Sequence, residues 1–378
     1  MSFAAKAASA LLWNAGRVLP VQKNKIVVTN FYGRGYGDNL KPIVEELLKR
    51  GEDLEIVWLT ADEAAASSLP AGVRAVPYTT RNRIRELCTA KVWLDNNRKG
   101  ARVKKPEQWY LQTWHGFALK RIERDAENTL PAGYAEYAAR DSAQTDLIVS
   151  NSALMTKIYK ESFWYSGEVA EFGSPRNDVL FAPPGGVQEK VRQVLHLPSG
   201  CRMALYAPTF RADESMDAYC LDYARLQKAL TGRFGGKWVI LIRLHPHVME
   251  RAGDLNFDGV TTFDATRYDD MQELLAASDA VVSDYSSLMF DYGLTRRPCF
   301  QFATDIEAYQ KDRNFYFPLH EMPFPLAENN DALEQAVLHW SREEAEEAWE
   351  QFCGRFGIHE DGKAAARCAD WILSKMKG

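Results

Sequence analysis

The stretch AVVSDYSSLMFDYG at residues 280–293 decides the fold class of this chain of 378 residues. Its first four residues suit a short buried strand, and LMFDYG at residues 288–293 suits a helix. Between the two, Ser286 and Ser287 bring hydroxyls, backbone N–H groups and the positive end of a helix dipole to one point. Such an arrangement binds phosphate, although an ordinary serine cap gives the same pattern. Because the strand fits a parallel sheet, we favour the ligand site.

Strand and helix signals alternate along the chain in two series. Alternation of this kind is typical of parallel sheets with helices on both faces. We therefore expect an α/β protein with two doubly wound domains. The expected strands are residues 25–29, 55–59, 91–94, 109–112 and 147–150 in the first series, and 203–206, 238–244, 260–263, 280–283 and 299–302 in the second.

The length of the chain also suits two domains. A Pro/Gly-rich segment, APPGG at residues 182–186, has the composition of a linker. We expect an N-terminal amphipathic segment at residues 1–22 and two domains at residues 23–185 and 186–340. Charged helices at residues 341–378 would then cross back to the first domain.

Composition excludes several classes of protein. With 46% hydrophobic and 26% charged residues the chain is globular, and its net charge of −5 argues against a general nucleic-acid binder. The six cysteines form no CxxC pair, and no apolar run is long enough to span a membrane. Near the N-terminus, a helix would place Phe3, Ala7, Leu11 and Val18 roughly on one side, with Lys6 and Arg17 as cations. This segment is either a weak membrane anchor or a helix packed on the protein's own surface.

A histidine follows the expected strand at residues 109–112. His115 and Gly116 lie at the carboxyl end of that strand, where open parallel sheets bind ligands. The ordinary pKa of histidine, about 6.5, suits a general base at neutral pH. A loop histidine held by a hydrogen bond is the alternative, and the residue types alone do not separate the two.

Two further polar segments belong to the first series. The loop GRGYGDN at residues 33–39 has glycines that allow close approach of a phosphate, and a mobile loop on the acceptor side is an equal alternative. Asp38 or Asn39 can cap the helix that follows. The turn SPRND at residues 174–178 clusters polar groups, but its alternative is a structural turn in which Asp178 caps a helix, and chemistry alone favours that alternative. The candidate residues on this side are Gly37, Asn39, Arg176, Asn177 and Asp178.

Phosphate-binding residue types follow strands of the second series. Thr209 and Arg211 come after residues 203–206, and arginine binds phosphate oxygens in pairs. Arg243 stands two residues before His245, so both would face one phosphate if the strand continues. No paired carboxylates typical of metal-assisted phosphoryl transfer accompany them, so we expect neither metal nor cofactor. The candidate residues on this side are Thr209, Arg211, Arg243, His245, Asp284, Ser286, Ser287 and Asp291.

Taken in order, these fragments resemble the CDP-glycerol glycerophosphotransferases of teichoic-acid synthesis. The likeness runs from about residue 24 to about residue 319 and includes GRGYGDN early and the tyrosine-rich segment around residues 305–316 late. Its five spaced motifs are specific for the family and much less so for the individual member. They are WHGFALK, SPRND, YAPTFR, RLHP and SDYSSLMFDYG.

The resemblance implies a glycosyltransferase-B type fold, with two Rossmann-like domains facing a cleft. It implies that the C-terminal domain binds CDP-glycerol, and that the N-terminal domain binds a lipid-linked saccharide or growing polymer as the acceptor. It places the protein peripherally on the cytoplasmic face of a bacterial membrane. By position, His115 matches the family's proposed base and His245 its second essential histidine, while Arg211, Ser286 and Ser287 fall at the donor phosphates.

The chain departs from the family pattern at two places. Phe117 and Ala118 stand where Thr-Pro is usual, and Ala212 precedes the aspartate expected directly after YAPTFR. A chain with little beyond the catalytic unit suits a primase better than a polymerase. The alternatives are a ribitol-phosphate transferase that uses CDP-ribitol, a nucleotide-sugar transferase of the same fold, and a non-catalytic binding protein, which would be expected to have lost His115 or His245.

Overall fold

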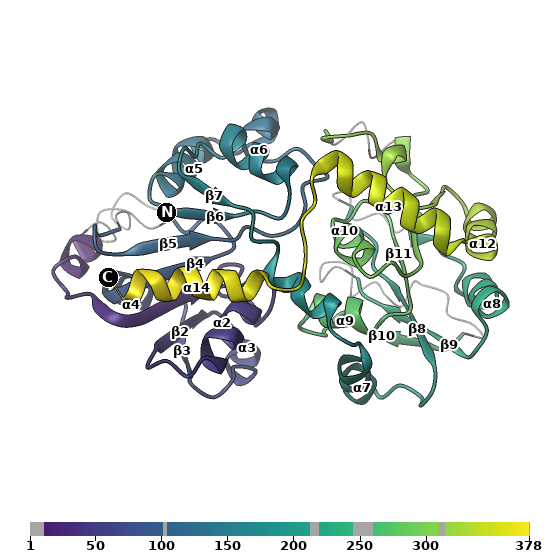
Figure 1. Ribbon diagram of the computed structural model, residues 1–378, viewed down its shortest axis with the longest axis horizontal. Helices are drawn as coiled ribbons and strands as arrows, with labels where there is room; N and C mark the ends of the chain where they lie inside the picture. The colour runs from purple at the N-terminus through teal and green to yellow at the C-terminus, as the bar shows by residue number, and fades with distance from the viewer. Residues whose placement is uncertain are drawn as a thin grey trace. The chain divides into compact units, whose positions relative to one another are not determined.

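The chain forms two compact units in the computed structural model (Figure 1). The structure describes residues 11–100, 104–211, 219–244, 260–307, 309 and 314–377. Both units are discontinuous in sequence. Unit 1 comprises Met1–His115, Ile122–Asp178 and Gly357–Gly378, and unit 2 comprises Gly116–Arg121 and Val179–Phe356.

Unit 1 contains, within the described residues, a seven-stranded parallel sheet in the order β3-β2-β1-β4-β5-β6-β7. This order starts at a central strand and winds outward in both directions, as in a doubly wound fold. Apolar residues fill both faces of its central strands, so those strands lie between two layers of helices. The strands are β1 (Gln22–Thr29), β2 (Glu55–Thr60), β3 (Val73–Pro77), β4 (Ala90–Asp95), β5 (Trp109–Gln112), β6 (Leu147–Val149) and β7 (Glu168–Ala170).

Helices cover the sheet of unit 1 on its two faces. On one face, α2 packs with the late helix α14 over β1, β2 and β4 (Figure 1). On the other, α4 packs against Val27, Val57 and Trp93. The helices are α2 (Leu40–Lys49), α3 (Glu63–Ser67), α4 (Thr80–Thr89), α5 (Tyr134–Ser142), α6 (Ala153–Ser162) and α14 (Ala364–Met376), with the 3-10 helix η1 (Glu123–Thr129).

Unit 2 contains a second parallel sheet, whose described strands run in the order β10-β9-β8-β11-β12-β13. Its strands are β8 (Arg202–Tyr206), β9 (Trp238–Ile242), β10 (Thr262–Asp264), β11 (Ala280–Ser283), β12 (Cys299–Phe302) and β13 (Leu326–Ala327). Its helices are α7 (Gly185–Val194), α8 (Tyr223–Phe234), α9 (Met271–Ala277), α10 (Leu288–Gly293), α12 (Asn330–Leu338) and α13 (Arg342–Phe356), with η5 (Leu319–Glu321).

These two sheets confirm the predicted class of two doubly wound α/β domains. The strands β3, β7 and β13 were not predicted. β3 is an edge strand with one buried residue, Val76, and β7 and β13, of three and two residues, are too short to give a pattern. The segment at residues 182–186 is not a linker. Pro184 is the N-cap of α7, whose first two residues are Gly185 and Gly186. The chain passes into unit 2 earlier, at Val179, through the 3-10 helix η2 (Pro175–Phe181).

The first residues that the structure describes form a short helix at residues 11–16, and this helix packs on unit 1. Trp13 is buried in the α4 layer, and a side chain at Gly16 would meet Cys88 at 2.8 Å. The same segment leaves Leu11 and Val18 71% and 83% exposed. It is therefore a packed helix with an uncovered apolar edge. Lys6 lies outside the described residues.

The C-terminal segment returns to unit 1 and is tied there by two carboxylates. Glu360 accepts hydrogen bonds from the Ser174 N–H and from the side-chain amides of Asn151 and Asn177. In turn, Asp178 accepts the backbone N–H groups of Ala364 (3.0 Å) and Ala365 (2.8 Å) at the start of α14. Asp178 thus caps a helix 186 residues further along the chain.

Asp178→Ala should destabilise unit 1 by about 0.5–2 kcal/mol, because two N–H groups at a helix start lose their acceptor. A matched control is Asp370→Ala, on the exposed side of α14, where the carboxylate pairs only at the surface with Arg50. That change should stay within about 0.5 kcal/mol. Urea unfolding followed by tryptophan fluorescence measures both. Equal stability of the two variants would show that the cap contributes nothing.

Candidate active site

Polar residues gather around His115 from four loops of unit 1. We call Asp38, Asn39, Asn96, His115 and Arg176 the His115 cluster. The loops that carry them follow β1, β4, β5 and β7, so all four leave the carboxyl edge of the sheet. Ligands of open parallel sheets bind at this edge. The structure therefore places His115 where a ligand-binding histidine is expected.

The His115 ring is held in one orientation. Its Nδ1 lies 2.6 Å from the Asn96 carbonyl oxygen, Trp114 stacks on it at 4.6 Å, and Phe31 meets it edge-on at 5.3 Å. Because a carbonyl only accepts, Nδ1 carries the proton and Nε2 is the basic nitrogen. Burial lowers the pKa of His115 below its ordinary value, and the bond to Asn96 only partly opposes this. At neutral pH the ring is uncharged and able to accept a proton.

Hydrogen bonds link the other members of the cluster. Asn39 was predicted to cap α2 and stands at the N-cap position, but its side chain makes no cap bond. Its amide instead donates to the Trp114 carbonyl at 3.0 Å and accepts the Arg176 N–H at 3.1 Å. The Arg176 guanidinium binds Asp38 at 2.9 Å, and Asp38 accepts a bond from the Asn96 side chain at 3.0 Å.

Backbone strain concentrates in the same place. Phe31, Tyr32, Asp38 and Trp114 have φ values of 40°, 59°, 54° and 52°. A left-handed backbone costs a non-glycine residue about 1–2 kcal/mol. Such conformations persist where the surrounding structure enforces them, and they cluster at functional sites. Strain at four residues in and next to the His115 cluster supports a functional role for it.

The predicted residues on this side of the protein divide into two groups. Asn39 and Arg176 join the His115 cluster. Asn177 and Asp178 instead bind Glu360 and α14, which is the structural alternative for that turn. The Gly37 carbonyl accepts a backbone bond from Lys41 at the start of α2. No acceptor role is tested for any of the five, and each stays a prediction.

Sequence reasoning missed the residues at the end of β4. The segment DNNRK at residues 95–99 follows a strand that was predicted, so a search of every strand end would have found it. Its charges are buried in ion pairs: Asp95 with Lys99 at 2.8 Å, and Arg98 with Glu123 at 2.8 Å. Burial raises the pKa of Asp141, a second carboxylate beside Arg98, to about 6. This network fixes the loop from which Asn96 reaches His115.

A second cluster lies at the carboxyl edge of the sheet in unit 2. We call Thr209, Arg211, Asp284, Tyr285 and Asp305 the Arg211 cluster. The Arg211 guanidinium binds Asp305 through two nitrogens at 2.7 and 2.9 Å and Asp284 at 2.9 Å. Burial opposes its charge, yet the bonds to Asp305 hold the pKa of Arg211 above its ordinary value. Two carboxylates therefore already neutralise the arginine that was expected to meet the donor phosphates.

Other groups at this edge are suited to an anion. The Thr209 hydroxyl is buried and has no hydrogen-bond partner among the described residues. Ser287 is the N-cap of α10 without a side-chain cap bond. Within the described part of the chain, the Ser286 hydroxyl accepts a long bond of 3.5 Å from the Leu288 N–H. Asp284 holds the loops in place by accepting the N–H groups of Thr209 and Tyr285.

Two members of the predicted donor set point elsewhere. The strand β9 ends at Ile242, so Arg243 does not continue it, and its guanidinium donates to the carbonyls of Ala265 and Tyr268. Asp291 is buried on α10 and accepts a bond from Gln272 at 2.9 Å. Both contacts hold secondary structure together. His245 lies outside the described residues.

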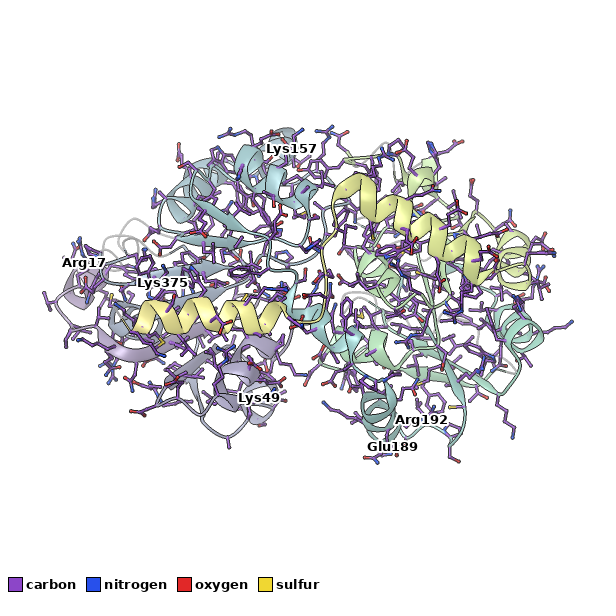
Figure 2. All side chains as sticks on the ribbon, in the orientation of Figure 1. Arg17, Lys49, Lys157, Glu189, Arg192 and Lys375 are labelled. Carbon is purple, nitrogen blue, oxygen red and sulfur yellow. The ribbon has the colours of Figure 1, made fainter. Side chains whose placement is uncertain are left out.

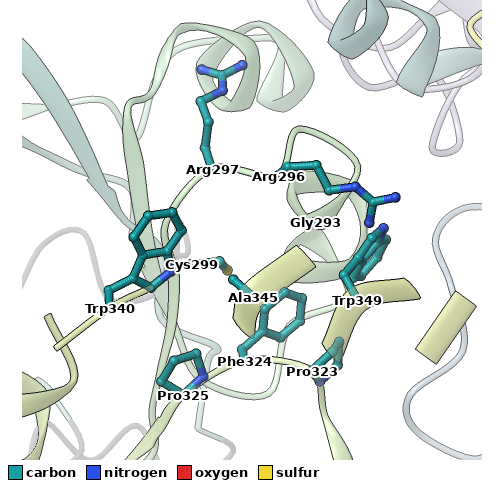
Figure 3. Close-up of a pocket in the computed structure, with 10 residues that line it drawn as sticks. All are labelled: Gly293, Arg296, Arg297, Cys299, Pro323, Phe324, Pro325, Trp340, Ala345 and Trp349. Atoms are coloured by element: carbon teal, nitrogen blue, oxygen red, sulfur yellow. The ribbon is translucent and has the colours of Figure 1, made fainter. Parts of the chain in front are cut away.

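A pocket in unit 2 is lined by none of these donor-side residues (Figure 3). It lies at the amino end of β12 and shares residues such as Phe324 and Trp340 with a hollow of about 380 Å³ beside α12 and α13. Apolar side chains dominate its wall. Because ligands of such sheets bind at the opposite edge, the pocket is not the candidate active site.

Comparison with known proteins identifies the family of this chain. The family model described as CDP-Glycerol:Poly(glycerophosphate) glycerophosphotransferase matches residues 11–374. A teichoic acid glycerol-phosphate transferase of Staphylococcus aureus is 32% identical, covering 93% of each chain. A teichoic acid poly(glycerol phosphate) polymerase of Staphylococcus epidermidis is 31% identical over 94% of this chain, which spans 51% of that protein's length.

A solved structure of the wall teichoic acid polymerase TagF, a histidine-to-asparagine variant soaked with CDPG, superposes with a TM-score of 0.84. It is 29% identical, and the match covers 98% of this chain and 93% of that one. The family model agrees with the resemblance drawn from the motifs, and the TagF structure agrees with the fold. The chain belongs to the CDP-glycerol:poly(glycerophosphate) glycerophosphotransferase family.

Proposed function

We propose that this protein transfers glycerol phosphate from CDP-glycerol to a hydroxyl of a teichoic-acid acceptor and releases CMP. The observation that carries the proposal is the neutral His115 ring, whose Nδ1 is fixed on the Asn96 carbonyl so that Nε2 is the basic nitrogen. Membership of the family supplies the donor and the reaction class.

In the proposed reaction His115 Nε2 takes the proton of the acceptor hydroxyl. The oxygen attacks the phosphorus that bears glycerol, the bond to the bridging oxygen of the diphosphate breaks, and CMP leaves with the electron pair. Stabilisation of the developing charge would come from groups at the carboxyl edge of unit 2, namely the Thr209, Ser286 and Ser287 hydroxyls and the backbone N–H groups that begin α10. Arg211 and Asp284 hold these groups in place.

The nature of the acceptor is part of the proposal. A lipid-linked saccharide or growing polymer would be met at the cytoplasmic face of the membrane, with the protein attached peripherally. No helix in the described part of the chain combines the length and the apolar character that a membrane span requires. Support for attachment comes from the exposed Leu11 and Val18 and from Arg17, whose side chain is labelled on unit 1 in Figure 2.

A ribitol-phosphate transferase and a nucleotide-sugar transferase are the competing assignments. CMP release from CDP-ribitol but not from CDP-glycerol would support the first, and UDP release from a UDP-sugar would support the second. Incubation with all three donors and a lipid-linked acceptor decides among them. A single added unit would identify a primase, and a ladder of products a polymerase.

His115→Ala should lower turnover at least 100-fold, because a positioned general base contributes about 10²–10⁴-fold. The dissociation constant for CDP-glycerol should change by less than about twofold, since His115 is assigned to the acceptor. His339→Ala, at an exposed histidine after α12, is the control and should keep full activity. Retention of more than about a tenth of the turnover by His115→Ala would remove it as the base.

Replacing Ser286 and Ser287 together with alanine should weaken CDP-glycerol binding by about 1–3 kcal/mol, because two hydroxyls are lost while the backbone N–H groups remain. Thr295→Ala, at the opposite end of α10, is the matched control. Calorimetric titration with CDP-glycerol measures the dissociation constant of the wild type, the double serine variant and the control. Arg211→Ala is a poorer test of the phosphate site, because it also leaves the buried carboxylates of Asp284 and Asp305 without their cation. Wild-type affinity in the double serine variant would refute this phosphate site.

Leu11→Ser combined with Val18→Ser should reduce co-sedimentation with vesicles that contain about a third anionic lipid, because the exposed apolar edge is lost. Binding of the wild type should also fall with added salt. Val194→Ser, at an exposed valine of α7 in unit 2, serves as the control. Equal sedimentation of the wild type and the double variant would argue against this segment as an attachment point.

A further inference from the structure

A closed circuit of hydrogen bonds runs through the backbone and ring of His115. The Trp114 carbonyl, one peptide before His115, accepts the Asn39 amide, and Asn39 accepts the backbone N–H of Arg176. From there the Arg176 guanidinium binds Asp38. Asp38 accepts a hydrogen bond from the Asn96 side-chain amide, and the Asn96 carbonyl accepts one from the Nδ1–H of His115.

The ion pair is the one charged link in this circuit. The side chains of Asp38 and Arg176 are only 9% and 10% exposed, so water screens the pair weakly. Each residue is also linked to one of the two segments that hold the ring. Asp38 binds the loop after β4 through Asn96, and Arg176 is linked through Asn39 to the loop that carries Trp114. The pair therefore fixes the distance between the two supports of the imidazole.

We propose that Asp38 and Arg176 form a positioning pair that holds His115 in its proton-accepting orientation. Neither residue is assigned to the chemical step. The proposal rests on the assignment of His115 as the base. It gives Arg176 a task different from binding the acceptor, and it brings in Asp38, which the sequence marked only as a possible helix cap.

The charges that face His115 shift its pKa, so the proposal predicts how the pKa of His115 changes when either member of the pair is replaced. Asp38 and Asp95 raise the pKa of His115, whereas Arg176 lowers it along with burial. Asp95 is itself paired with Lys99 at 2.8 Å. Loss of Asp38 alone leaves the arginine charge, so the pKa of His115 should fall. Loss of Arg176 alone leaves the carboxylate, so the pKa should rise.

The test compares Asp38→Asn, Arg176→Gln and the double variant. Because the base acts in its neutral form, the acid limb of the pH profile of kcat/KM follows the pKa of His115. It should move to lower pH in Asp38→Asn, to higher pH in Arg176→Gln, and between the two in the double variant. At the pH optimum, kcat should fall about 10–100-fold through misplacement of the base, with KM for CDP-glycerol unchanged. Lys157→Gln, on the unit 1 surface (Figure 2), is the charge-matched control.

A measurement without turnover separates this proposal from the proposed function. NMR titration of the histidine rings in the full chain reports the pKa of His115 directly, with its signal assigned by its absence in His115→Gln. Opposite shifts in the two single variants show that the pair acts on the ring, whether or not His115 is the base. Shifts of the same sign would overturn the proposal. So would kcat within twofold of wild type in both single variants when His115→Ala itself has lost turnover.

Discussion

Parallel strands covered by helices on both faces are the constraint on which this molecule depends. The central strands β1, β4, β8 and β11 each contain a buried apolar stretch, and their polar residues stand toward the strand ends. Polar side chains gather where strands end, and in both units the clusters lie at the carboxyl edge. There the loops must also satisfy their own backbone groups, which is why amides and carboxylates dominate both clusters.

The two clusters meet this requirement in different ways. Around His115, amides and carbonyls provide most of the bonds, and one ion pair closes the circuit. Around Arg211, two carboxylates surround one guanidinium, which also lies about 5 Å from the rings of Tyr285 and Tyr309. The first arrangement leaves a neutral ring able to take a proton. The second is a rigid frame whose charge is already balanced, so an anion there would depend on hydroxyl and N–H donors.

Local patterns predicted the two doubly wound sheets, ten of their strands within a few residues, and the position of His115 at a strand end. They could not predict partners that are distant in sequence. The sequence near Asp178 does not indicate that this residue caps α14. The sequence near Arg211 does not indicate that its guanidinium pairs with Asp305. Asn39 was read as a helix cap because short-range rules favour that role, but the Trp114 carbonyl, 75 residues away, takes its amide. The edge strand β3 was missed for a local reason, because its five residues include only one that is buried and so give a weak strand pattern.

The division of the chain between the units has a consequence for synthesis on the ribosome. All seven strands of unit 1 exist once residue 170 has been made, but one face of their sheet needs Cys368, Ala369 and Ile372 of α14 for its cover. The larger part of unit 2, Val179–Phe356, is translated in the interval. Although most of it is made later, unit 2 can complete its core first. Until α14 emerges, the nascent chain carries an open apolar surface, so slow translation or early release between these points should favour aggregation.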